Sequence, residues 1–132
     1  MKENTKKETL ELEKGILPIS TIATVLGVHQ RTLRIYDNEG ILSPKRSDKN
    51  RRNYSFNDLE KAKTIAFLTK NLAVNLAGIK IIFSILNYMQ IKPDEYCNFI
   101  EKIAKKAGIN TEIQEKNKTK NSNRGRKPKS NS

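Results

Sequence analysis

ISTIATVLGVHQRTLRIYDNEGIL, residues 19–42, is the stretch that decides the fold of this 132-residue chain. Its first half predicts a short helix that Ser20 caps and Gly27 ends. The apolar positions of that helix lie on one face: Ile22, Ala23, Val25 and Leu26. A tight turn follows, and a second helix is predicted over residues 29–39. Two short helices joined by a glycine turn are typical of a helix-turn-helix.

The second predicted helix carries side chains suited to the edges of DNA bases. A helix that enters the major groove needs polar groups at its N-terminal end, where Gln suits adenine and Arg suits guanine or phosphate. The candidates at that end are His29, Gln30, Arg31, Thr32 and Arg34. His29 can either cap the helix or contact DNA. Farther along, the apolar positions at helical spacing are Leu33, Ile35 and Tyr36.

A strongly basic segment comes next. Residues 41–44 (ILSP) and the region around Tyr54 predict two extended arms, with the turn at residues 48–50. This hairpin, or wing, has basic side chains at its tip: Lys45, Arg46, Lys49, Arg51 and Arg52. Arg31 and Arg34 alone would be read as a solvated helix face, but beside the wing arginines they favour a nucleic-acid surface.

Two further helices are predicted after the wing. Ser55 and Asp58 form a capping box that opens a helix ending before Asn71. Asn75 is expected to cap the second helix, over residues 76–86. The wing and this helix pair complete the domain that the first two helices begin.

A last helix is predicted over residues 94–107, between Pro93 and Gly108. Its apolar stripe is Tyr96, Phe99, Ile100, Ile103, Ala104 and Ala107. The stripe can close the protomer's own core or pair with a second protomer. The fold class is therefore mainly α: a winged helix-turn-helix with a small β-hairpin wing, a following helix pair and a short C-terminal helix.

The charge of the chain indicates a polyanionic partner. It carries 26 Lys and Arg against 14 Asp and Glu, a net charge of +12. The excess lies in two zones, residues 16–86 with a surplus of six and residues 116–132 with seven bases and no acid. No amphipathic basic helix lies at either end, so nucleic acid is favoured over a membrane surface.

The domain organisation follows from these patterns. We expect a flexible N-terminal segment over residues 1–15, the DNA-binding domain over 16–90, the C-terminal helix over 91–110 and a disordered basic tail over 111–132. The tail contains RGRKP, which resembles an AT-hook whose Arg124 and Arg126 would enter a narrow minor groove. A plain basic tail that raises non-specific affinity is the alternative.

The sequence contains no candidate residues for several classes of function. Cys97 and His29 are each the single residue of their kind, which excludes an internal disulfide and the usual zinc sites. There is no Ser/His/Asp set, paired carboxylate or phosphate-binding glycine loop, so we expect no enzyme activity and no cofactor. Without an apolar run of about 18 residues, the chain is expected in the bacterial cytoplasm, on the nucleoid.

Residues 19–86 resemble the DNA-binding domain of the MerR family. The matching motifs are TLRIYDNEGI (residues 32–41) and RNYS (residues 52–55), which ends the wing. VNLAGIKIIFSIL, residues 74–86, is similar to the heat-shock repressor (HspR) branch. The resemblance implies phosphate contacts by four side chains: Arg34, Tyr36, Arg52 and Tyr54. Tyr36 is equally well placed for the core.

The resemblance also implies a function. It suggests a dimer that binds an inverted-repeat operator in double-stranded DNA and represses heat-shock or chaperone genes, with a chaperone such as DnaK as co-repressor. An apolar surface at residues 88–99 could receive that partner, or a second protomer. The alternatives are a MerR-type activator of another stress regulon, an architectural or excision-type winged-helix protein, and an RNA-binding protein. The last helix is too short for a free-standing coiled coil of three or four heptads.

Overall fold

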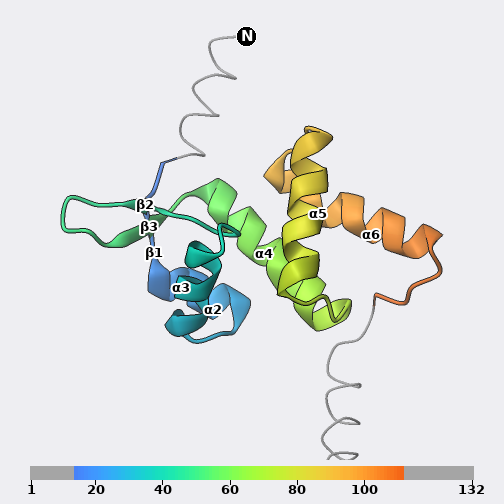
Figure 1. Ribbon diagram of the computed structural model, residues 1–132, viewed down its shortest axis with the longest axis horizontal. Helices are drawn as coiled ribbons and strands as arrows, with labels where there is room; N and C mark the ends of the chain where they lie inside the picture. The colour runs from blue at the N-terminus through green and yellow to red at the C-terminus, as the bar shows by residue number, and fades with distance from the viewer. Residues whose placement is uncertain (1–13, 112–132) are drawn as a thin grey trace, which may run out of the picture.

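The computed structural model describes residues 14–111, and Figure 1 shows how their elements are arranged. In chain order these are β1 (Leu17–Pro18), α2 (Ile19–Leu26), α3 (Gln30–Asn38), β2 (Lys45–Arg46), β3 (Arg52–Tyr54), α4 (Phe56–Asn71), α5 (Leu76–Tyr88), the 3-10 helix η1 (Pro93–Glu95) and α6 (Tyr96–Lys106). The predicted fold class is confirmed: a mainly helical winged helix-turn-helix with a small antiparallel sheet. None of the helices in this part of the chain is long and apolar enough to cross a membrane.

The turn between α2 and α3 is the glycine turn that the sequence predicts. Gly27 has the left-handed φ of 67°, and its N–H donates to the carbonyl of Thr24 at 3.2 Å. The predicted cap at Ser20 is wrong, because α2 begins at Ile19 and its N-cap is Pro18, which makes no side-chain cap bond. Pro18 is held extended by its pairing with Asn53, so the sheet determines where this helix begins.

The sheet is three-stranded, with the order β1-β3-β2 and antiparallel pairing throughout. The β2–β3 hairpin confirms the predicted wing, and Asn50 takes a left-handed φ of 61° in its turn. The first arm is shorter than predicted, because Ile41 and Leu42 are buried anchors and the strand begins only at Lys45. Strand β1 was not predicted, since two residues are too few to show a strand period.

Side-chain caps start the next two helices, as the sequence predicts. The Ser55 hydroxyl accepts from the N–H of Asp58 at 3.0 Å, and the Asp58 carboxylate accepts from the N–H of Ser55 at 2.9 Å. Asn75 accepts from the N–H of Gly78 at 2.9 Å, and α5 continues to Tyr88, past the predicted end. In the last predicted helix, the first turn is the separate 3-10 helix η1.

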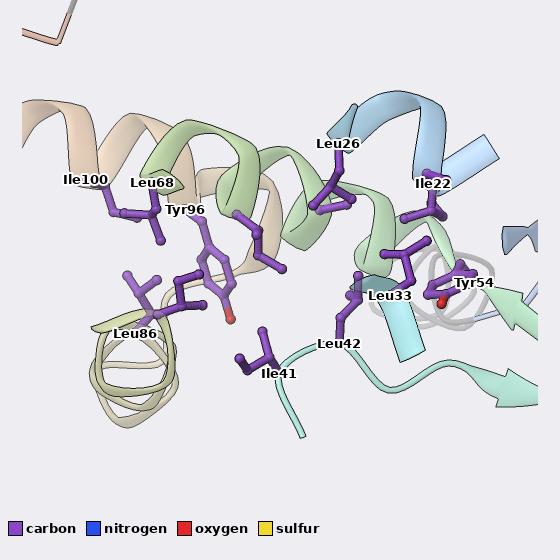
Figure 2. Close-up of a cluster of buried hydrophobic side chains, with 14 residues drawn as sticks. Ile22, Leu26, Leu33, Ile41, Leu42, Tyr54, Leu68, Leu86, Tyr96 and Ile100 are labelled. Atoms are coloured by element: carbon purple, nitrogen blue, oxygen red, sulfur yellow. The ribbon is translucent and has the colours of Figure 1, made fainter. Parts of the chain in front are cut away.

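The core forms one continuous cluster along α4. Figure 2 shows Ile22, Leu33 and Tyr54 at the end near the sheet, and Leu86 and Ile100 at the other end. Helix α4 contacts α2 and β3 on one side and η1 and α6 on the other. The helix-turn-helix and the C-terminal helices are therefore joined through one shared helix.

The stripe of α6 closes the protomer's own core. Tyr96, Ile100 and Ala104 are buried, and the ring of Tyr96 lies 5.5 Å from the ring of Phe83, centroid to centroid. Ile103, which the sequence places in the same stripe, is half exposed. Of the two roles predicted for this stripe, the structure shows the first.

Replacing Ser55 by alanine is expected to lower the free energy of unfolding by about 1 kcal/mol, because the first turn of α4 loses its cap. Ser55 is buried and the capping bond is complete, so water does not replace it. The matched control is Ser20→Ala, which removes the same hydroxyl from a helix start that it does not cap. Urea denaturation of both variants checks this; an equal loss in both would contradict the assignment of the caps.

Candidate nucleic-acid interface

Helix α3 begins at a histidine cap. The Nδ1 atom of His29 accepts from the backbone N–H of Arg31 at 3.1 Å, and the ring remains exposed. The structure thus shows the capping role that the sequence left open for His29. Because Nδ1 accepts the capping bond, Nε2 is the ring nitrogen left for a further contact.

One face of α3 is exposed along its whole length. Arg31, Arg34, Ile35 and Asn38 are all exposed and follow the spacing i, i+3, i+4 and i+7, while Leu33 is fully buried. The prediction that Ile35 belongs to the apolar stripe is wrong, since it stands between the two arginines and Asn38. Ile35 and Asn38 were missed as candidates, although their spacing from Arg31 was visible in the sequence.

The remaining candidates on α3 are half-buried. Gln30 and Thr32 lie at its N-terminal end, and Tyr36 packs against the core cluster. Burial raises the pKa of the Tyr36 hydroxyl above its ordinary value. Its backbone carbonyl accepts from the N–H of Ile41 at 2.9 Å, which fastens the end of α3 to the segment leading into the wing.

An ionic contact fastens the wing to α3. The Nε of Arg52 donates to Oδ2 of Asp37 at 3.0 Å, and Nη2 of Arg46 lies 3.6 Å from the same oxygen. The side chains of Arg52 and Asp37 are only 17% and 16% exposed, so solvent screens this pair little. Asp37 holds one arginine from each strand of the wing against α3, a role that was not predicted.

The tip of the wing is basic and ordered by its own contacts. Arg46 donates to the carbonyl of Asn50 at 3.2 Å, and the Ser47 hydroxyl accepts from the N–H of Arg51 at 3.1 Å. The side chains of Arg46 and Arg51 are exposed, as are those of Lys45 and Lys49. Within residues 14–111, the wing side chains Lys45, Lys49 and Arg51 have no acidic partner, and the same holds for Arg31 and Arg34 on α3. The wing lies beside α3 (Figure 1).

Tyr54 does not lie on this surface, so its predicted phosphate contact is corrected. Its side chain is fully buried, and its hydroxyl finds no hydrogen-bond partner within residues 14–111. Burial raises the pKa of this hydroxyl to about 12. The physical reason is β1, which pairs Leu17 with Tyr54 and leaves the ring on the core side of the sheet.

Arg124 and Arg126, with both terminal segments, lie outside the described residues. Within residues 14–111, no group of three or more His, Cys, Asp and Glu side chains could hold a metal ion. Cys97 is half-buried, with its sulfur 3.4 Å from the hydroxyl of Thr64. This contact makes Cys97 a small packing residue between α6 and α4.

Replacing Asp37 by asparagine is expected to lower the free energy of unfolding by about 2 kcal/mol, because Arg52 keeps its burial and loses its counter-charge. The matched control is Glu101→Gln, which breaks the exposed pair with Lys105 and should cost under about 0.5 kcal/mol. Urea denaturation at low and high salt measures both. Equal losses of stability in Asp37→Asn and Glu101→Gln would contradict a buried ion pair between Asp37 and Arg52.

Residues 17–85 match the family model described as MerR HTH family regulatory protein, which is just over half of the chain and includes α3 and the wing. The chain belongs to the MerR family. This MerR-family domain runs from β1 into α5 and stops at residue 85, and α6 lies beyond it.

Curated relatives match over a stretch of similar length. The putative heat shock protein HspR of Streptomyces coelicolor is 41% identical over 69 residues, which is 52% of this chain and 46% of that protein. The HTH-type transcriptional regulators GlnR of Bacillus anthracis and Bacillus cereus are 35% identical over 65 residues, 49% of this chain and 50% of theirs. The chain therefore spans about half the length of the relatives it matches.

Proposed function

We propose that this protein is a transcriptional regulator that binds an inverted-repeat operator as a dimer and represses heat-shock or chaperone genes. The observation that carries the proposal is the pair of basic surfaces on α3 and the wing, held together by Asp37. Such a surface serves DNA because one element can enter the major groove while the other follows the phosphates.

The individual roles divide between bases and phosphates. Gln30, Arg31 and Thr32 lie at the end of α3 that would meet base edges. Arg34 and the wing arginines would bind phosphates, and Arg52 would use its terminal guanidinium nitrogens for this while Nε binds Asp37. In the tail, Arg124 and Arg126 would add a minor-groove or non-specific contact.

The regulon is inferred from the relatives. The Streptomyces coelicolor protein is named as a putative heat shock protein, HspR, and is more similar to this chain than the GlnR regulators are. We extend that relation to repression of chaperone genes in the bacterial cytoplasm, on the nucleoid. A chaperone such as DnaK would act as co-repressor, so that unfolded protein relieves repression by drawing the chaperone away.

Genomic selection followed by transcription tests this function. Fragmented DNA from the source organism is passed over the purified full chain, and the retained fragments are sequenced. We expect promoters of chaperone genes to be enriched, and transcription from them in vitro to fall when the protein is added. More transcript would show an activator; enrichment without any effect on transcription would show an architectural protein. Stronger retention of RNA than of duplex DNA would overturn the proposal.

A further inference from the structure

Helix α5 has an apolar face that no described residue covers. Ile81, Ile85, Tyr88 and Met89 are all at least half exposed, and Tyr88 is 89% exposed. With the small Ser84 among them, these residues follow helical spacing along one side, and we call them the α5 outer face. A shallow depression runs along it, lined by Lys80, Ile81, Ser84, Ile85 and Tyr88. A row of large apolar side chains of this kind marks an interaction surface.

The chain itself offers little to cover this face. The stripe of α6 is used in the protomer's own core, as are Tyr96 and Phe99 from the apolar surface predicted at residues 88–99. The segments outside the described residues contain few apolar side chains: Met1, Leu10, Leu12 and Ile113. These are too few to match the apolar row on α5, so no segment within this sequence is suited to cover the face.

Charge favours a second copy of this chain as that molecule. The chain carries a net charge of +12, so two copies repel each other across most of their surfaces. The α5 outer face is the exception, because the sole charged residue of α5 is Lys80. Its Nζ lies 3.2 Å from a carboxylate oxygen of Glu39, which neutralises it. Two copies can therefore approach along α5 with little repulsion.

The residue order on this face suits a two-fold contact. Ser84 lies near the middle of the face, with Ile81 on one side of it and Tyr88 on the other. When two α5 helices cross antiparallel at Ser84, the small side chain leaves room for the partner's Ile85, and Ile81 meets the partner's Tyr88. Such a self-complementary patch is what a symmetric dimer requires.

This placement also suits DNA binding. The Lys80–Glu39 contact ties α5 to the residue that follows α3, so the crossing of two α5 helices sets the distance between two α3 helices. Figure 1 shows the wing and α5 at opposite ends of α4, so a contact through α5 leaves the wing free. We propose that the α5 outer face is the dimer interface of this protein, covered by the same face of a second copy. The proposal rests on the proposed function, which calls for a dimer.

Sedimentation equilibrium of the full chain tests this interface. We expect the native protein to be a dimer, and Ile85→Glu to raise the dimer dissociation constant at least 100-fold. The matched control is Ile103→Glu on α6, since Ile85 and Ile103 are both 50% exposed, and it should remain a dimer. Tyr88→Glu gives a second variant at a position so exposed that folding is not at stake. Thermal unfolding followed by circular dichroism shows that each variant is folded.

The outcomes separate the interface from the function. A dimer that survives both Ile85→Glu and Tyr88→Glu overturns the proposal, as does a native protein that is monomeric even on operator DNA. In the latter case the α5 outer face serves a different protein. A native dimer without sequence preference for DNA would refute the proposed function and leave the interface standing. If the interface and the proposed function are both right, the monomeric Ile85→Glu variant should still protect one half-site of the operator in a footprint.

Discussion

Replacing Arg31 and Arg34 together by alanine is expected to weaken binding to the selected operator at least 100-fold. Both side chains are exposed on one face of α3 and have no acidic partner within the described residues. An arginine bound to a base edge or a phosphate contributes about 1 to 3 kcal/mol, and each 1.4 kcal/mol is a factor of ten in affinity. Two such contacts at about 1.4 kcal/mol each correspond to the expected 100-fold loss.

Fluorescence anisotropy with labelled operator and with a scrambled duplex measures this effect. The matched control is Lys102→Ala combined with Lys106→Ala, which removes the same charge from exposed positions on α6. We expect the control to lower affinity for both duplexes slightly and equally, whereas the α3 variant loses affinity for both duplexes and, in addition, its preference for the operator. Equal losses in the two double variants would show that only net charge matters, which contradicts a reading role for α3.

The second large effect is a loss of stability in alkali that depends on Tyr54. Burial raises the pKa of its hydroxyl in the folded chain to about 12, against an ordinary value of 10.0. Well below pH 10 the Tyr54 hydroxyl is neutral in both the folded and the unfolded chain, so its ionisation does not lower the free energy of unfolding. As the pH rises from 10 through 12, the unfolded chain ionises first and folding is disfavoured, by about 2 to 3 kcal/mol in total.

Comparison with Tyr54→Phe isolates this contribution. Phenylalanine has no hydroxyl to ionise, so the variant should keep the 2 to 3 kcal/mol that the native protein loses between about pH 9 and 12. At neutral pH it should be as stable as the native protein or about 1 kcal/mol more stable, because the buried hydroxyl has no partner. Tyr88→Phe, at an exposed position, serves as the control. A Tyr54→Phe variant that weakens in alkali as much as the native chain would contradict the burial of this hydroxyl.

The Tyr54→Phe variant also shows whether the Tyr54 hydroxyl contacts DNA. The family resemblance implies a phosphate contact by this tyrosine, whereas its side chain is fully buried. We expect operator affinity of Tyr54→Phe to equal that of the native protein. A tenfold loss would show that the hydroxyl reaches the phosphates after all when DNA is bound.

The parts of the fold that could be predicted are those encoded in a few neighbouring residues. The capping box at Ser55, the cap at Asn75 and the glycine turn at Gly27 each depend on side chains within four positions of one another. The wing was predictable for the same reason, since its turn is short and polar. The basic side chains at its tip and the arginines of α3 could be recognised from their residue types alone.

What could not be predicted depends on contacts between distant segments. Strand β1 exists because residues 17–18 pair with residues 53–54, and that pairing moves the start of α2 away from Ser20 and buries Tyr54. The role of Asp37 likewise depends on Arg52, fifteen residues later. The use of the α6 stripe in the protomer's own core follows from packing on α4, which periodicity within α6 does not reveal.

In vitro selection from random duplex DNA at physiological salt shows whether the protein reads one inverted repeat. The full chain is used, and the retained sequences are read after several rounds. We expect enrichment of one inverted repeat, because each α3 helix of the dimer would bind one half of the repeat. Enrichment of A·T content alone, without a repeat, would contradict it and would show an architectural binder led by the basic tail.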